Sequence, residues 1–247
     1  PYGSSAASDV YKRQPQEKTA LVKGRSLAQR LFLMPKTIKR PANERGQADH
    51  GWLQARFTFS FAGYHDPQHM GFRSLRVMNN DTIQPGGGFP THPHDNMEIF
   101  TYVIEGQLEH RDSLGNGSII EAGNLQYMSA GSGVRHSEFN PSSENLTHLY
   151  QIWLQPNEIN GEPRYAEKPL ADSATPNRLT LLFSRDGRNG STAIRQNAEI
   201  YFGQADAGQR VETPASSETP HAWLQLIAGQ LSALGETLTT GDGLAIE

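Results

Sequence analysis

Short strand-like segments separated by turns rich in Gly, Asn and Pro dominate this sequence. The stretch "ARFTFSF", residues 55–61, alternates aromatic and small polar residues with the period of two that a half-buried strand requires. Similar segments recur at a spacing of roughly 8–12 residues, and long amphipathic helical patterns are missing. The pattern predicts an all-β barrel or sandwich and argues against an α/β fold.

An internal repeat refines this prediction. The stretch "YVIEGQLEHRD", from Tyr102, matches "QLIAGQLSALG", from Gln225, with Gly-Gln-Leu in register. Further on, "IEAGNLQYM" matches "LTTGDGLAI", with Gly123 opposite Gly241. A repeated strand–turn–strand unit predicts two copies of one β-barrel. The second copy stops at Glu247, soon after this turn, so we expect the second barrel to lack its last strands.

The chain is expected to divide into four parts. An N-terminal barrel spans 34–155, a polar and proline-rich linker spans 156–177, and a C-terminal barrel spans 178–247. Residues 1–33 stand apart as a non-native or upstream leader, because "PYGSSAASDVYKRQ" resembles a translated adapter and Met34 is a plausible native start. A basic transit peptide is the alternative for this leader.

Composition narrows the classes of function. The chain has no Cys, which excludes disulfides, thiolate catalysis and iron–sulfur clusters and fits a cytoplasmic protein. A formal net charge of −4 argues against nucleic acid as the main partner. No apolar run approaches the ~18 residues of a membrane span. We expect a monomer that binds small molecules.

Two pairs of potential metal ligands distinguish the first barrel. His92 and His94, in "PGGGFPTHPH", and His136 and Glu138, in "VRHSEF", are each spaced i, i+2. This spacing places both side chains of a pair on one face of a strand. Facing strands would combine them into three imidazoles and one carboxylate, a set that suits Fe(II) or Mn(II). Spacing alone leaves Glu98 open as the carboxylate, because it has the same parity as His94.

The other histidines have no partner at ligand spacing. His50, His65 and His69 lie in a polar region and are expected to be solvated. His110 and His148 lie in strand-like segments, where hydrogen bonds in the core or at its rim are expected. Residues 110–112, "HRD", are expected to lead into a hairpin turn.

The repeat limits the number of metal sites. Its register aligns His92, His94 and Glu98 with Ala215 and Ser217 and with a lone histidine at position 221. The second copy therefore lacks the paired histidines. We expect one site per chain, in the first barrel.

The segment "GFPTHPHDNMEIFTYVIEGQLEHRDSLGNGSIIEAGNLQYMSAGSGVRHSEFNPS" resembles the pirin family of bicupins, especially the bacterial pirin-like quercetin 2,3-dioxygenases. The resemblance extends from about residue 39 to the end and includes "ANERGQADHGW", "MGFRSLRV" and "HLYQIW". It implies two tandem cupin barrels, which are double-stranded β-helices of the jelly-roll type. It also implies one divalent metal ion, most often iron as Fe(II), in the N-terminal barrel. Mn, Ni, Cu, Co and Zn are the alternatives.

The resemblance also assigns roles to individual residues. It implies that His92, His94, His136 and Glu138 are the ligands. Ordinary cupins take their carboxylate from the position of Glu98, whereas pirin-like proteins take it two residues after the third histidine. Glu98 is therefore expected to hydrogen-bond and orient a ligand imidazole.

The implied activity is that of a metal-dependent dioxygenase that cleaves flavonols such as quercetin with O₂ and releases CO. Glu138 is the expected catalytic base for the 3-hydroxyl of the flavonol, and Phe89 is a candidate for the pocket wall or the core. The alternative is a non-enzymatic, metal-binding, redox-sensing regulator of the pirin type with the same ligands. A cupin isomerase or hydrolase is a third possibility.

Overall fold

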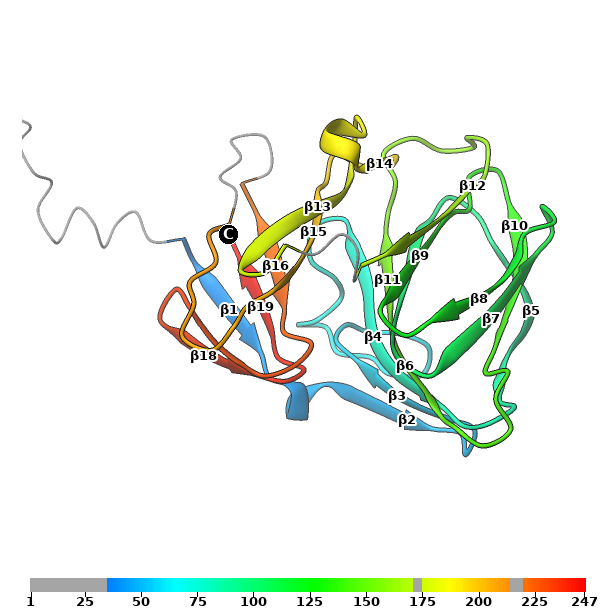
Figure 1. Ribbon diagram of the computed structural model, residues 1–247, viewed down its shortest axis with the longest axis horizontal. Coiled ribbons are helices and arrows are strands. Elements are labelled where there is room, and N and C mark those ends of the chain that lie inside the picture. Colours follow the sequence, from blue (N-terminus) through cyan, green and yellow to red (C-terminus); the bar gives the residue numbers. More distant parts are fainter. Residues whose placement is uncertain (1–34, 171–174, 214–219) are drawn as a thin grey trace, which may run out of the picture. The chain divides into compact units, whose positions relative to one another are not determined.

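The computed structural model describes residues 35–170, 175–213 and 220–247, so the expected leader, 1–33, lies outside the described residues. Strands form nearly all of the regular structure, as predicted, with short 3-10 turns at η1 (Ala42–Glu44) and η2 (Arg188–Gly190) (Figure 1). In the described part of the chain, no helix has the length and apolar character needed to cross a membrane.

Two antiparallel sheets form the N-terminal barrel (Figure 1). The larger sheet has the order β12 (Arg164–Pro169), β9 (Asn124–Ser129), β6 (Glu98–Glu105), β11 (Thr147–Leu154), β4 (Leu75–Ile83), β3 (Leu53–Phe57) and β2 (Gly46–Asp49). The smaller sheet has the order β5 (Gly88–His94), β10 (Val134–Phe139), β7 (Gln107–Asp112) and β8 (Gly117–Glu121).

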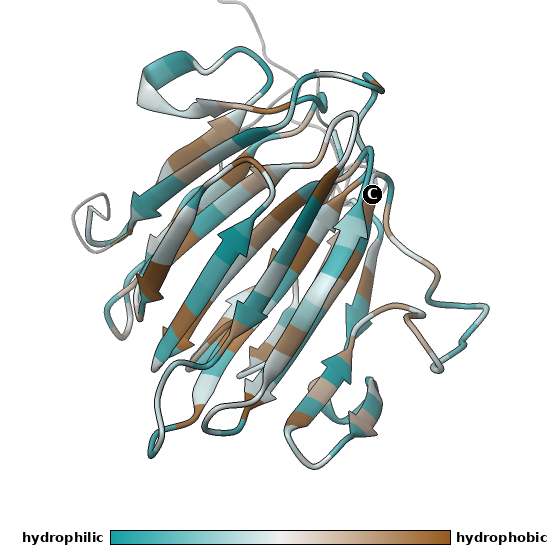
Figure 2. Cartoon of the chain, turned by 90° about the vertical axis from the view of Figure 1, so that its right-hand side faces the viewer, coloured by the Kyte–Doolittle hydropathy of each residue, from teal (hydrophilic) through white to brown (hydrophobic). Residues whose placement is uncertain are grey.

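Side-chain alternation gives each strand one apolar face. In Figure 2, brown hydrophobic and teal hydrophilic residues alternate along the strands. In β3, Leu53, Ala55 and Phe57 are buried and the two residues between them are exposed. Because successive side chains of a strand point to opposite faces, this pattern fixes which face lines the barrel. The strand predicted over 55–61 begins earlier, at Leu53, and ends at Phe57.

The described residues of the C-terminal cupin form three small sheets. One has the order β1 (Thr37–Arg40), β19 (Gly243–Ile246) and β16 (Ala222–Gln225). The second has the order β14 (Thr192–Ala193), β13 (Arg178–Ser184) and β15 (Ile200–Gln204), and the third is the hairpin of β17 (Gln230–Ala233) and β18 (Glu236–Thr239).

The two halves share the strand and turn order that the repeat predicts. Gly106 lies between β6 and β7, and Gly229 lies between β16 and β17, with positive φ angles of 75° and 92°. A Cβ atom at position 106 would lie 2.3 Å from the carbonyl oxygen of Leu146, so glycine is needed there for two separate reasons. Ala215 and Ser217, the expected counterparts of the paired histidines, lie outside the described residues.

The structure differs from the expected domain division in two segments. Residues 37–40, expected in the N-terminal barrel, form β1 and pair with β19. Residues 164–169, expected in the linker, form β12 and pair with β9. Each segment adds an edge strand to a sheet, and an edge strand tolerates the proline and polar residues that make these segments look irregular. Residues 171–174 lie outside the described residues.

Asp242 anchors β1 and η1 to the C-terminal sheet. Its carboxylate accepts hydrogen bonds from the backbone N–H groups of Ala42 and Thr239, at 2.8 and 2.9 Å. The Lys39 ammonium lies 3.1 Å away. Burial opposes ionisation of Asp242, but these hydrogen bonds outweigh it and lower the pKa of Asp242 to about 2.

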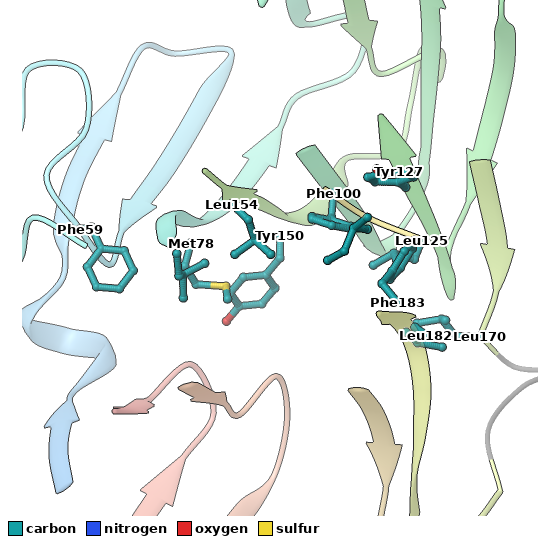
Figure 3. Packing of buried hydrophobic residues seen from close by; sticks show 12 residues of the cluster. Phe59, Met78, Phe100, Leu125, Tyr127, Tyr150, Leu154, Leu170, Leu182 and Phe183 are labelled. Carbon is teal, nitrogen blue, oxygen red and sulfur yellow. The ribbon is translucent and has the colours of Figure 1, made fainter. Parts of the chain in front are cut away.

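An apolar core joins the larger sheet of the barrel to β13 (Figure 3). The ring of Phe183, which is fully buried, lies 4.9 Å from the ring of Phe100 and 5.2 Å from that of Tyr127. Burying one such side chain contributes roughly 1.5–3 kcal/mol. Phe100 belongs to β6, so its face of that strand points away from the barrel interior and toward the C-terminal cupin.

Candidate metal centre

Three histidines converge at one end of the smaller sheet. The ring centroid of His92 lies 4.8 Å from that of His94 and 4.4 Å from that of His136. The rings of His94 and His136 are 4.9 Å apart, and one nitrogen from each of the three lies within 4.8 Å of the others. His136 is buried, whereas His92 and His94 are half-buried. The group therefore lies where a small molecule can approach it from one side.

Strand register produces this convergence. β10 pairs with β5 so that His136 lies opposite His92 and Val134 lies opposite His94. A bulge then shifts the register, and Glu138 lies opposite Phe89. Bulges often occur next to active sites, where they redirect side chains. On β5, the backbone carbonyl of Pro90 lies 2.8 Å from Nδ1 of His92, and this contact orients the imidazole.

The surroundings keep two of these imidazoles neutral. Burial, together with the neighbouring His136 and His92, lowers the pKa of His94 to about 4. Burial, followed by the charges of His92 and His110, lowers the pKa of His136 to about 3. Neutral imidazole is the form that binds a metal ion, so at neutral pH these side chains are available as ligands.

Glu138 lies beside this histidine group, in the barrel interior. The residue is 3% exposed, and its carboxylate accepts hydrogen bonds from Nε2 of Gln151, at 3.0 Å, and from Oγ1 of Thr101, at 3.3 Å. It lies near His136 and His110, which together with it form a second group of possible ligands. The structure thus brings three of the four predicted ligands together and places the fourth next to His136.

Comparisons with known proteins identify the family. The Pirin family model matches residues 38–154, and the model of the quercetinase C-terminal cupin domain matches residues 181–247. A protein of Escherichia coli K12 named quercetin 2,3-dioxygenase is 48% identical over 208 residues, which is 84% of this chain and 88% of that protein. This chain belongs to the pirin family. A pirin-like protein of Caulobacter vibrioides is 40% identical over 212 residues, or 85% of this chain and 90% of that one.

Solved pirin structures extend the comparison. The crystal structure of the bacterial pirin YhhW from Escherichia coli in complex with nickel(II) is 46% identical and superposes with a TM-score of 0.79. The match covers 85% of this chain and 90% of that one. The predicted family and the predicted pair of cupin domains are confirmed by these comparisons.

The role expected for Glu98 is wrong. Its carboxylate accepts hydrogen bonds from Oη of Tyr127 and Oγ of Ser129, each at 2.5 Å, and from the backbone N–H of Arg195 at 3.1 Å. None of these partners is an imidazole. Asn96, with a φ of 45°, turns the chain between β5 and β6. His94 and Glu98 therefore lie on different strands, and their even spacing in the sequence does not place them on the same face. Glu98 lies on the face of β6 that contacts the C-terminal cupin.

His110 lies closer to the candidate site of this pirin than the sequence indicates. The side chain is fully buried, with Nε2 3.3 Å from a carboxylate oxygen of Asp112 and Nδ1 3.5 Å from Nδ1 of His136. The core hydrogen bonding expected for it is present, but one partner is a predicted ligand. Only the pairing of β7 with β10, which sets Glu138 opposite His110, reveals this contact.

The remaining histidines lie outside the group. His148 makes the expected hydrogen bond at the rim of the core, with Nε2 2.7 Å from Nδ2 of Asn80. His65 is exposed, and His69 lies 2.9 Å from Asp66 in the same loop. Phe89 lies next to the site, with its ring centroid 6.4 Å from that of His92.

Proposed function

We propose that this chain is a metal-dependent dioxygenase that cleaves flavonols such as quercetin with O₂ and releases CO. The observation that carries the proposal is the group of three imidazoles with one approachable side, beside a buried carboxylate. The names of its relatives support it, since quercetin 2,3-dioxygenase of Escherichia coli is 48% identical over most of both chains.

The donor atoms fit a divalent metal ion. Nε2 of His136 is buried and has no hydrogen-bond partner among the described residues, an arrangement that is unfavourable unless the nitrogen binds something. We infer that His92, His94, His136 and Glu138 hold one metal ion, with Fe(II) favoured and Ni(II), Mn(II), Cu(II), Co(II) or Zn(II) as alternatives. When bound, such an ion supplies Lewis acidity and open coordination positions.

Glu138 is the proposed proton acceptor for the 3-hydroxyl of the flavonol. Gln151 and Thr101 hold its carboxylate through hydrogen bonds from the inner face of the larger sheet. Burial, followed by the charge of Glu138, raises the pKa of the neighbouring Asp81 to about 8, although the field of Arg45 opposes this rise. Asp81 is therefore mostly protonated at neutral pH, and its carboxyl adds little negative charge near the base.

His110 and Asp112 determine which ring nitrogen of His136 carries the proton. With Asp112 ionised, Nε2–H of His110 donates to its carboxylate and Nδ1 of His110 is left as an acceptor. Nδ1–H of His136 then donates to this acceptor across 3.5 Å. The lone pair of His136 is consequently on Nε2, the atom that has no other partner. Hydrogen bonds of this kind are common behind histidine ligands.

The test is anaerobic reconstitution with Fe(II), and in parallel with each alternative metal, followed by O₂ uptake and CO release with quercetin. We expect turnover that His94→Ala abolishes and that the exposed His65→Ala leaves unchanged. Absence of turnover with several flavonols and every metal would refute the enzyme and favour the redox-sensing regulator.

A further inference from the structure

A polar hollow of about 490 Å³ lies on the outer face of the larger sheet, away from the histidine group. Arg45 and Arg56 line it, together with Asn80 of β4 and Tyr150 of β11. Thr240, from the turn between β18 and β19, is also part of its lining. A volume of this size suits a small organic ligand.

The central feature of the hollow is a buried guanidinium. Arg45 is 6% exposed, and its Nε and Nη1 have no hydrogen-bond partner in the described part of the chain. No carboxylate of the described residues lies within 4.0 Å of it, and Tyr150 lines the same hollow. A buried charge without a paired counter-charge is strongly unfavourable. A bound anion would therefore stabilise the guanidinium of Arg45.

The surroundings favour an anion. The lining contains two arginines and no aspartate or glutamate. Asp242, which follows the turn, is already engaged by Lys39 and Ala42. Asp81 follows Asn80 along β4, so its side chain points to the opposite face of the sheet, into the barrel. No carboxylate in the lining therefore offsets the positive potential of the two arginines.

The hollow is separate from the candidate metal centre. Asn80 and Tyr150 alternate along β4 and β11 with Asp81 and Gln151, and Gln151 contacts Glu138 inside the barrel. Since alternate residues of a strand point to opposite faces, the two sites lie on opposite sides of one sheet. The motif "ANERGQADHGW", residues 42–52, builds the entrance by placing Arg45 between η1 and β2.

We propose that this hollow binds a small oxyanion, a carboxylate or phosphate group, through the guanidinium of Arg45, with Arg56 at the mouth. Guanidinium groups bind carboxylate and phosphate oxygens through hydrogen bonds, and Nε and Nη1 of Arg45 are donors that have no partner among the described residues. The site is independent of the proposed dioxygenase reaction.

Isothermal titration calorimetry on the full chain tests this site, with inorganic phosphate and succinate as separate probes at constant ionic strength in chloride. We expect saturable binding of at least one probe, and the probe that binds identifies the preferred oxyanion. Arg45→Met should weaken binding at least tenfold, whereas Arg111→Met, at an exposed side chain on the smaller sheet, should not change it.

Two further variants separate a loss of binding from a loss of folding in Arg45→Met. Asn80→Asp adds a negative charge to the lining of the hollow, so it should weaken anion binding at least tenfold in a chain that still folds. Arg56→Met, at an exposed position, should weaken binding with no change in melting temperature. The proposal is overturned if neither probe binds saturably, or if a folded Arg45→Met or Asn80→Asp chain binds as tightly as the wild type.

Discussion

Replacing His110 with Phe isolates the contribution of the hydrogen-bond chain behind His136. The substitution keeps a buried ring between Tyr165 and His136, whose ring centroids lie 5.1 and 5.3 Å from that of His110. It removes the acceptor for Nδ1–H of His136. Loss of such a partner lowers metal affinity by about 10–100-fold, or about 1.4–2.7 kcal/mol. Calorimetric titration with Ni(II), or anaerobic competition of Fe(II) with a chelator, measures this change.

Stability provides the control for this variant. Asp112 keeps its hydrogen bonds from Asn116 and from the backbone of Leu114, whereas the buried Nδ1–H of His136 loses its acceptor, so the free energy of unfolding should fall by about 1–3 kcal/mol. His110→Gln, which retains an acceptor, should recover part of the affinity. A folded His110→Phe protein that binds metal as tightly as the wild type would show that the hydrogen-bond chain does not orient His136.

Three further changes test the account of the fold. Gly106→Ala should cost well over the roughly 1 kcal/mol expected of Gly115→Ala, because both have positive φ but only position 106 would place Cβ against Leu146; equal losses in urea unfolding would contradict this. Asp242→Asn should lose about 2 kcal/mol at neutral pH. Because the folded pKa of Asp242 lies below its unfolded value, this stability exists above about pH 4 and disappears toward pH 2; a wild-type-like acid unfolding profile would argue against it. Glu98→Gln should lower the melting temperature but leave metal affinity unchanged, and a tenfold loss of affinity would restore Glu98 to the metal site.

The sequence predicts those features of the fold and of the candidate site that the local periodicity of a strand determines. His92 and His94 share a face because side chains alternate along a strand, and the same holds for His136 and Glu138. The repeat predicts two barrels because the same order of strands and turns recurs, with a glycine of positive φ between two consecutive strands in each copy, Gly106 in the first and Gly229 in the second. These features depend on residues close together in the chain.

Local periodicity in the sequence does not predict contacts that depend on the pairing of distant strands. Glu98 follows His94 by four residues, yet a turn at Asn96 separates their strands and their faces. The contact of His110 with the candidate site depends on pairing between β7 and β10, which lie more than twenty residues apart. β12 looks like linker because its partner strand, β9, lies well before it in the sequence.

The most direct test of the central claim is anomalous diffraction from crystals loaded with Fe(II) or Ni(II). We predict a single metal peak per chain, in contact with the imidazoles of His92, His94 and His136 and the carboxylate of Glu138. A metal peak bound by His110, His136 and Glu138 without the other two histidines, or no peak in the first barrel, would contradict the proposed centre.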